Sequence, residues 1–308
     1  MSLEIISSSF LALIQDFGRF GLQKYGITNG GPVDEHAYLW ANYLLRNNYK
    51  APQLEVSMGA FSARFTKKTM IAVCGADLSI TLNDQPLTLW KSHVVYAGDV
   101  IKFVSPKTGL RSYLAIAGGF QVDPQLTSCA TVIREGLGGL SKDGGKLATG
   151  DKVSYKETKE EMGRSVPAKF IPSYEQKISL RFMPNVTANG CDTASVQQFT
   201  EQIFKVTPQM DRMGYKLSGN PIKTSNTGII SQGISIGTIQ LPKDGQPIVL
   251  MRDRQTMGGY PQIGCVAYLD IALLAQSMPG TEIKFIATDM KTLEPELTAY
   301  KNFFHLDN

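Results

Sequence analysis

The residues best suited to chemistry in this sequence lie together in one short segment. Its sequence is Arg252-Asp-Arg-Gln-Thr-Met-Gly-Gly-Tyr-Pro261. An arginine such as Arg254 binds carboxylate, carbonyl or phosphate oxygens through a planar pair of donors. Asp253 can hold an arginine in position or act as a base, and Gln255 can donate to a developing oxyanion. The segment therefore predicts a site for an anion or a carbonyl group.

A predicted strand delivers this segment. Residues 246–251 form an apolar run that follows a turn, which is typical of a buried strand. Gly258 and Gly259 can adopt positive φ or let a ligand approach the backbone, and Tyr260 can orient a substrate or share proton transfer. A salt-bridged hairpin turn would have the same local pattern, so the segment alone leaves both interpretations open.

Two other motifs resemble sites without meeting their requirements. The segment 233–237 fits Gly-x-Ser-x-Gly, but strand and turn residues follow it where a nucleophile elbow needs a helix, and the only later histidine is His305. The glycine-rich segment 139–147 ends in Lys-Leu, where a P-loop needs Lys-Ser or Lys-Thr. We therefore predict neither a serine hydrolase nor a P-loop.

The composition is that of an ordinary globular protein with room for two domains. Of its 308 residues, 43% are hydrophobic and 19% are charged. The net charge of +4 is spread along the chain, and no apolar run reaches about 18 residues. We therefore predict neither a nucleic-acid partner nor a membrane partner.

The cysteines and histidines indicate reduced thiols and no metal. Four cysteines lie far apart without a Cys-x-x-Cys pair, and the N-terminus lacks the features of a signal peptide, which favours a cytoplasmic protein. The three histidines show no metal-ligand spacing, so we predict no metal site.

Short apolar runs between turn residues dominate the first half and predict a barrel or sandwich. We expect one opening strand within residues 2–14 and later strands at 70–74, 78–82, 94–96, 100–104 and 113–117. Asp34 can cap a helix, and the predicted helix behind it repeats apolar residues on one face up to Leu45. Residues 136–146 are expected to form a surface loop.

The second half repeats this mainly β pattern after a charged, proline-containing stretch. We place the domain boundary in that stretch, with an N-terminal β-rich domain at 1–158 and a C-terminal barrel domain at 173–308. Strands are expected at 177–182, 203–206, 263–268 and 282–287, and short helices at 196–202 and 270–277.

Three blocks of the sequence together resemble one protein family. They are Gln15-Asp-Phe-Gly-Arg-Phe-Gly21 with Gly31-Pro-Val-Asp34 and Ala41-Asn42; Asp211-Arg-Met-Gly-Tyr215; and Gln232-Gly through Asp253-Arg-Gln-Thr-Met-Gly-Gly-Tyr-Pro261. The residues of these blocks and the order of the blocks along the chain resemble the C subunit of the ATP-dependent 5-oxoprolinase. The same family is called KipA, allophanate hydrolase subunit 2, or the second half of the biotin-dependent carboxyltransferase domain.

The resemblance implies a fold, partners and a cofactor. It implies a mainly β chain with two cyclophilin-like barrel subdomains and a few short helices. It also implies direct contact with the KipI-like B subunit of 5-oxoprolinase, action with the A subunit, and ATP use by the complex, which opens 5-oxoproline to glutamate. Met290-Lys-Thr292 matches the biotin-carrier motif only in part, so we expect no biotin on this chain.

The blocks also supply the candidate site residues. Asp253, Arg254, Gln255 and Tyr260 are the catalytic candidates. The substrate-binding candidates are Arg212, Tyr215, Gly258, Gly259, Gln15, Asp16, Arg19, Asp34 and Asn42. For Asp34 the helix cap is an equal alternative, and Asp16 and Arg19 are equally compatible with a structural turn.

Three functions remain open from the sequence. The first is a component of the 5-oxoprolinase complex, which we favour. The second is half of a biotin-dependent carboxyltransferase of the urea carboxylase type, which would need a biotin-bearing protein. The third is a non-catalytic partner of a KipI-like kinase inhibitor.

Overall fold

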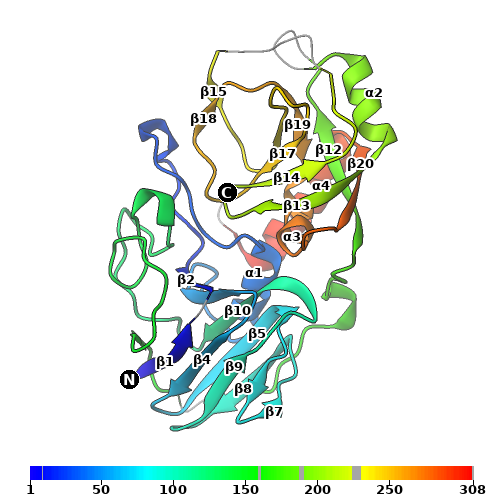
Figure 1. Ribbon diagram of the computed structural model, residues 1–308. Helices are drawn as coiled ribbons and strands as arrows, with labels where there is room; N and C mark the ends of the chain where they lie inside the picture. Colours follow the sequence, from blue (N-terminus) through cyan, green and yellow to red (C-terminus); the bar gives the residue numbers. More distant parts are fainter. Residues whose placement is uncertain (9, 159–160, 187–190, 224–229, 307–308) are drawn as a thin grey trace. The chain divides into compact units, whose positions relative to one another are not determined.

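The chain folds into two compact units (Figure 1). The structure, a computed structural model, describes residues 1–8, 10–158, 161–186, 191–223 and 230–306. Unit 1 comprises Met1–Phe20 and Gly30–Tyr174, and unit 2 comprises Gly21–Asn29 and Glu175–Asn308. Part of the stretch that we chose as the boundary, residues 159–160, lies outside the described residues.

Unit 1 contains two β-sheets. The first has the order β11-β1-β4-β9-β6-β7 and the second the order β2-β3-β10-β5-β8. The strands of the first are β1 Ser2–Ser8, β4 Phe61–Phe65, β6 Thr81–Leu82, β7 Gln85–Pro86, β9 Val100–Phe103 and β11 Lys152–Ser154. Those of the second are β2 Leu11–Gln15, β3 Gln53–Ser57, β5 Thr69–Asp77, β8 Lys91–Val95 and β10 Thr108–Ile116.

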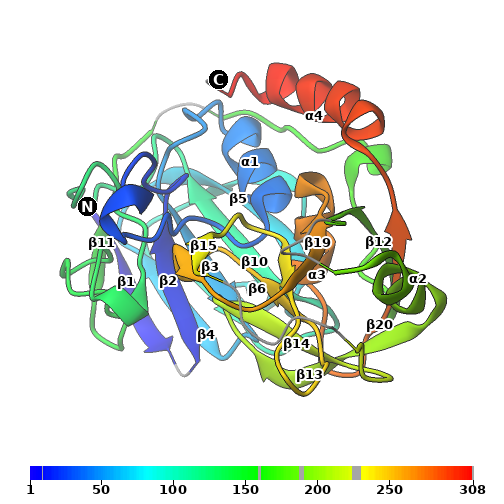
Figure 2. The ribbon, with the colours of Figure 1, turned by 90° about the horizontal axis from the view of Figure 1, so that it is seen from above.

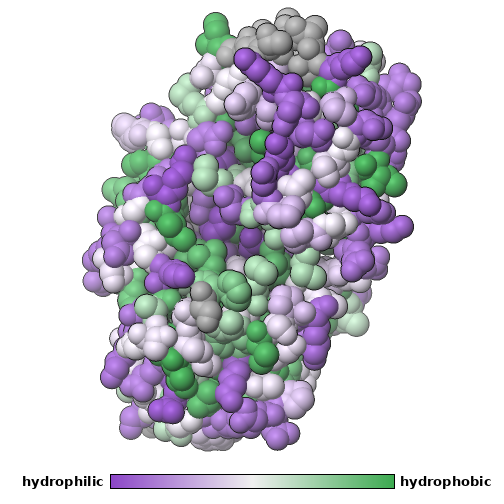
Figure 3. Space-filling view, in the orientation of Figure 1, coloured by the Kyte–Doolittle hydropathy of each residue, from purple (hydrophilic) through white to green (hydrophobic). Residues whose placement is uncertain are grey.

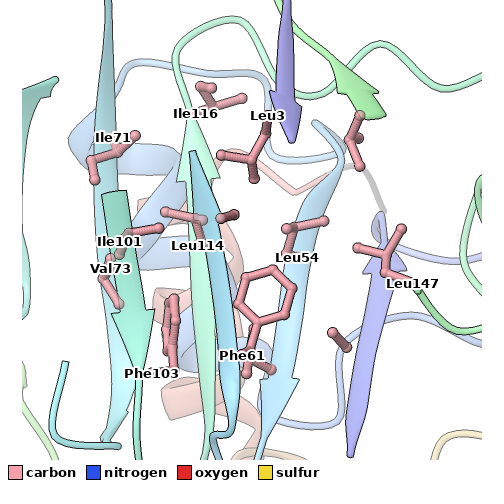
Figure 4. Packing of buried hydrophobic residues seen from close by; sticks show 14 of the residues in the cluster. Leu3, Leu54, Phe61, Ile71, Val73, Ile101, Phe103, Leu114, Ile116 and Leu147 are labelled. Atoms are coloured by element: carbon pink, nitrogen blue, oxygen red, sulfur yellow. The ribbon is translucent and has the colours of Figure 1, made fainter. Parts of the chain in front are cut away.

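The core of unit 1 lies between these two sheets (Figure 4). In β5, Ile71 and Val73 point into this core together with Phe61 of β4 and Phe103 of β9. Alternate side chains of a strand point to opposite faces, so the residues between them need a second cover. The helix α1, Glu35–Leu44, provides it by packing on β5, β10 and β8. Double cover explains why almost all of β5 and β10 is buried.

Unit 2 is built on a closed barrel. Its strands follow the order β12-β19-β16-β17-β14-β13-β20, and β20 pairs in parallel with β12 to close it. They are β12 Lys177–Pro184, β13 Ile203–Met210, β14 Gly214–Ser218, β16 Thr238–Gln240, β17 Ile248–Leu250, β19 Gln262–Val266 and β20 Glu282–Ala287. A separate two-stranded ladder joins β15, Gln232–Gly233, to β18, Met257–Gly258.

Helices complete both units. Unit 2 contains α2 Thr193–Glu201, α3 Ile271–Ala275 and α4 Met290–Phe304, and α4 follows β20 (Figure 2). Single 3-10 turns occur at Gln23–Tyr25, Ile133–Glu135, Ala168–Phe170 and Tyr268–Asp270. The aromatic core of unit 2 includes Phe199 of α2, whose ring centroid lies 4.5 Å from that of Phe285 in β20.

The prediction of a mainly β chain with few helices is confirmed, with three corrections. The strands of unit 1 form two sheets instead of a second closed barrel. The helix α1 covers the outer face of the second sheet, and the inner faces of the two sheets pack against each other. The opening strand is two strands, β1 and β2. The helix α4 was not predicted, because Pro295 interrupts its sequence pattern, although Asp289 caps it by accepting from the amide of Thr292.

The surface of unit 1 carries several exposed hydrophobic side chains. The exposed side chains include Ile6, Phe10, Met58 and Val104. The space-filling view shows hydrophobic residues, in green, at the surface over the strands of this unit (Figure 3). Within the part of the chain that the structure describes, no helix is long and apolar enough to cross a membrane.

Candidate functional site

The polar segment 252–261 lies in unit 2, shortly after β17. Hydrophobic Met251 is fully buried, and Arg252, Asp253 and Arg254 behind it are each no more than 6% exposed. The segment then reaches β18, which pairs with β15. Charged groups are rarely buried to this extent without partners, so their contacts reveal what they do.

Asp253 forms a two-point ion pair with Arg212. The Nε and Nη2 atoms of Arg212 donate to the two carboxylate oxygens at 2.8 and 2.9 Å. The backbone amide of Asp253 also donates to the carbonyl of Arg212 at 2.8 Å. Parallel donors on one planar group fix both side chains in orientation. Asp253 thus holds an arginine in position, and its pairing joins the two polar blocks 211–215 and 252–261.

Arg254 binds backbone carbonyl groups. Its Nε donates to the carbonyl of Ile234 at 3.1 Å and its Nη1 to that of Met251 at 3.3 Å. Burial, with a smaller effect of the neighbouring Arg252 cation, lowers the pKa of Arg254 to about 10. The carbonyl of Arg254 accepts from the hydroxyl of Thr28 at 3.1 Å, which ties residues 21–29 to this segment. These contacts assign the Arg254 guanidinium to the architecture of the loop.

Gln255 and Tyr260 line a pocket of about 520 Å³ in unit 2. The walls combine apolar side chains with carboxamides and a few charged groups. The lining residues are Pro208, Gln209, Met210, Asp211, Met213, Gly214, Lys216, Gln240, Ile248, Leu250, Gln255 and Tyr260. Tyr260 is 46% exposed and also lines a second pocket, of about 480 Å³, with Lys223 and Lys243. Of the four catalytic candidates, these two therefore have access to a ligand-sized space.

Gly258 allows a close approach, but by side chains of the protein. Its φ is outside the positive range, and a Cβ placed there would lie 2.5 Å from Cδ1 of Ile234 and 2.8 Å from Nε2 of Gln240. We expected Gly258 to adopt positive φ or to admit a ligand. Its missing side chain instead leaves room for the carboxamide of Gln240, a pocket residue. Gly259 beside it is half-buried.

Tyr215 lies apart from the pocket. Its side chain is fully buried in unit 2, and its hydroxyl donates to the carbonyl of Ala275 at 3.3 Å. A buried phenol needs such a partner, and the ring fills the barrel core. The structure thus brings together Arg212 and Asp253 as a pair, and Gln255 and Tyr260 at the pocket, while Tyr215 serves packing.

The candidates at the end of β2 belong to unit 1 and hold its loops together. Gln15 donates to the carbonyl of Thr131 at 3.0 Å and accepts from the amide of Gly31 at 3.1 Å. The carboxylate of Asp16 accepts from the hydroxyl of Ser128 and from the amide of Cys129. Burial, reinforced by this carboxylate, raises the pKa of the Cys129 thiol. These bonds fasten β2 to the segment 128–131.

Arg19 completes this fastening. It is 1% exposed, and its Nη2 donates to the carbonyls of Ala130 at 2.7 Å and Ser128 at 3.3 Å. No lining residue of the two pockets described above belongs to this group. These buried donors satisfy backbone carbonyls of the segment 128–131.

Asp34 lies at the start of α1 and Asn42 in its last turn. Asp34 caps the helix by accepting from the amide of Ala37 at 2.9 Å, and it also accepts from the hydroxyl of Tyr174 at 3.3 Å. Burial, with a smaller contribution from Asp34, raises the pKa of Tyr174. Asn42 donates to the carbonyl of Ala51 at 3.1 Å and accepts from Asn47 at 3.0 Å. Both residues therefore fix the helix and the turn behind it.

Sequence reasoning missed Gln240. It ends β16, is 2% exposed and lines the 520 Å³ pocket. In the sequence it is an isolated carboxamide before Leu-Pro, without a glycine or a second polar residue at its side. Only the pairing of β16 with β17 and β19 brings it to the pocket, so no local signal could have identified it.

Comparison with known proteins supplies a family and relatives. The family described as "Carboxyltransferase domain, subdomain A and B" matches residues 25–287. The chain is 35% identical to the C subunit of 5-oxoprolinase from Escherichia coli over 291 residues, which cover 94% of this chain and 92% of that protein. It is 32% identical to the C subunit of 5-oxoprolinase from Haemophilus influenzae over 310 residues, which cover 99% of this chain and 96% of that protein.

A solved structure shares the fold. The crystal structure of urea amidolyase from K. lactis superposes with a TM-score of 0.90 over 98% of this chain, at 23% sequence identity. The match covers 20% of that much longer chain. This likeness concerns the fold alone.

Proposed function

We propose the function of this chain from its family: the chain belongs to the carboxyltransferase domain family, subdomain A and B. Within that family it acts as one component of a 5-oxoprolinase, which opens the ring amide of 5-oxoproline to give glutamate with hydrolysis of ATP. The observation that carries this conclusion is the 35% identity to the C subunit of 5-oxoprolinase from E. coli along 94% of the chain.

The partners in this proposal are the KipI-like B subunit, in direct contact, and the A subunit. Both relatives are named as the C component of 5-oxoprolinase, which supports a complex of several chains. As a working part of such a complex, the protein is expected in the cytoplasm.

ATP is assigned to the complex and not to the 520 Å³ pocket of this chain. Lys216 is the one cation among the residues that line the 520 Å³ pocket, and it donates to Asp244 at 2.7 Å. Asp211 adds a negative charge to the same wall. A triphosphate needs several free cationic or amide donors, so this set of residues does not fit it.

The residues of this chain that act on the substrate are Gln255 and Tyr260 in this proposal. Both line the pocket, and the carboxamide of Gln255 donates to the carbonyl oxygen, where negative charge develops when the amide is attacked. The ring of Tyr260 forms a wall against which a small substrate is held. Arg254, Arg212 and Asp253 support the loop that carries these two side chains.

The alternative is half of a biotin-dependent carboxyltransferase. The family description favours it. It also needs a carbonyl-binding pocket, but it requires a biotin-bearing protein. We expect no biotin to be attached to this chain.

The test is ATP-dependent formation of glutamate from 5-oxoproline by this chain together with its two companion chains. We expect activity that disappears when this chain is omitted and that falls at least tenfold with Gln255→Met. The matched control is Gln197→Met, an exposed glutamine of α2 in the same unit, which should leave the rate unchanged. A folded complex without activity on 5-oxoproline, but with carboxyl transfer from carboxybiotin, would establish the alternative.

A further inference from the structure

The 520 Å³ pocket of unit 2 has a buried hydrogen-bond donor without a protein partner. Nε2 of Gln240 makes no hydrogen bond to any residue that the structure describes, although the side chain is only 2% exposed. Buried donors of this kind are uncommon in native proteins, because each costs free energy that a partner would recover. Gln240 is at the same time a lining residue of the pocket.

The barrel places this carboxamide on its outer face. Ile239 pairs with Val249, and both are fully buried in the barrel core, whereas Gln240 pairs with Ile248, which also lines the pocket. The side chain of Gln240 therefore points away from that core, where Gly258 of β18 leaves room for it. A Cβ on Gly258 would also lie 3.7 Å from Nε2 of Gln255. Two carboxamides thus lie against one bare Cα at the pocket.

The charges of the pocket are already engaged. Lys216 donates to Asp244 at 2.7 Å, and the carboxylate of Asp211 accepts from the amides of Met213 and Gly214 at 2.7 and 3.1 Å. What the pocket offers a ligand is therefore apolar wall and neutral amide groups. This combination suits the neutral amide group of a ligand.

We infer that this pocket binds the cyclic amide of a small lactam and that Gln240 is a binding residue for it. A carboxamide carries a donor and an acceptor side by side, and a lactam presents C=O and N–H on one edge. The lactam carbonyl accepts from Nε2 of Gln240 on one lone pair and from the carboxamide of Gln255 on the other. The apolar side chains of Ile248 and Leu250 contact the methylene groups of the ring. This inference rests on the proposed function, which it deepens by naming the group that is recognised.

The test compares Gln240→Met with Gln262→Met in the assembled three-chain complex. Gln262 is the cross-strand neighbour of Gln240, and its Nε2 also lacks a partner among the described residues, but it is not a lining residue of this pocket. We expect Gln240→Met to raise KM for 5-oxoproline about tenfold, the loss of one good hydrogen bond, and Gln262→Met to change it less than twofold. Gly258→Ala, which places a methyl against the amide, should also raise KM. Equal KM values for wild type and Gln240→Met would overturn the inference while leaving the proposed function intact.

A second measurement separates the two proposals if the complex makes no glutamate. Binding of 2-pyrrolidinone, the unsubstituted five-membered lactam, is then followed by calorimetry against proline, whose ring lacks the carbonyl. Binding of the lactam that Gln240→Met weakens, with no binding of proline, supports the pocket without the reaction. Binding that Gln240→Met leaves unchanged, or no binding of the lactam to wild type, overturns the inference.

Discussion

The two units use similar polar sequences for different ends. The segment that begins at Gln15 in unit 1 and the one that begins at Arg252 in unit 2 both combine carboxylate, arginine, carboxamide and glycine. In unit 1, Gln15, Asp16 and Arg19 are all bonded to the segment 128–131 or to the turn at Gly31. In unit 2, the arginines and Asp253 have the same kind of role, but Gln255 and Tyr260 beyond them reach a pocket.

The difference shows what marks a site. Residue type and spacing identify where polar groups are concentrated, and both units pass that criterion. The groups that can serve a ligand are those that line a cavity and keep hydrogen-bonding capacity unused, as Gln240 does. A buried charge that bonds to carbonyls or to an opposite charge of the protein itself stabilises a loop instead.

The largest effect is expected from breaking the Arg212–Asp253 pair. Both side chains are about 5% exposed, and Asp253→Ala leaves the guanidinium buried without its carboxylate. We expect a loss of about 3–5 kcal/mol in the free energy of unfolding, measured by urea titration of unit 2's transition. Lys205→Ala removes the exposed ion pair with Glu282 and should cost no more than about 1 kcal/mol. Equal losses in the two variants would contradict the assignment of the pair to a buried, structural role.

A somewhat smaller effect is expected from the corresponding carboxylate of unit 1. Asp16→Ala removes the acceptor for the hydroxyl of Ser128 and for the amides of Cys129 and Gly18. The free energy of unfolding should fall by about 2–3 kcal/mol, because two of these donors lie in the segment 128–131, which β2 holds through this carboxylate. The measurement is urea unfolding followed by a probe in unit 1. A loss below about 0.5 kcal/mol would show that the fastening does not depend on Asp16.

The sequence allowed much of the fold to be predicted, and less of the site. Strands such as β20 could be located because turn residues bound short runs rich in β-branched and aromatic residues. The helix α4 was missed because its local pattern contains Pro295. Gln255 and Tyr260 could be proposed because they sit in one dense segment, whereas Gln240 reaches the same pocket only through pairing of strands distant in sequence. That pairing depends on the closed barrel, which no single window of the sequence encodes.

The smallest effect, and the one whose sign carries most information, comes from two buried glutamines. Gln15 in unit 1 is fully buried and bonded at both ends of its carboxamide, while Nε2 of Gln240 in unit 2 has no partner among the described residues. Gln15→Met should lower the free energy of unfolding by about 1–2 kcal/mol, because it leaves the amide of Gly31 and the carbonyl of Thr131 without their hydrogen-bond partner. Gln240→Met should raise it by up to about 1 kcal/mol, because methionine fills a similar volume without a buried donor that lacks a partner. Thermal unfolding of both variants measures the two shifts. Gln240→Met could instead lose as much stability as Gln15→Met. That result would mean that the Gln240 carboxamide is hydrogen-bonded within the folded chain and is not available to a ligand.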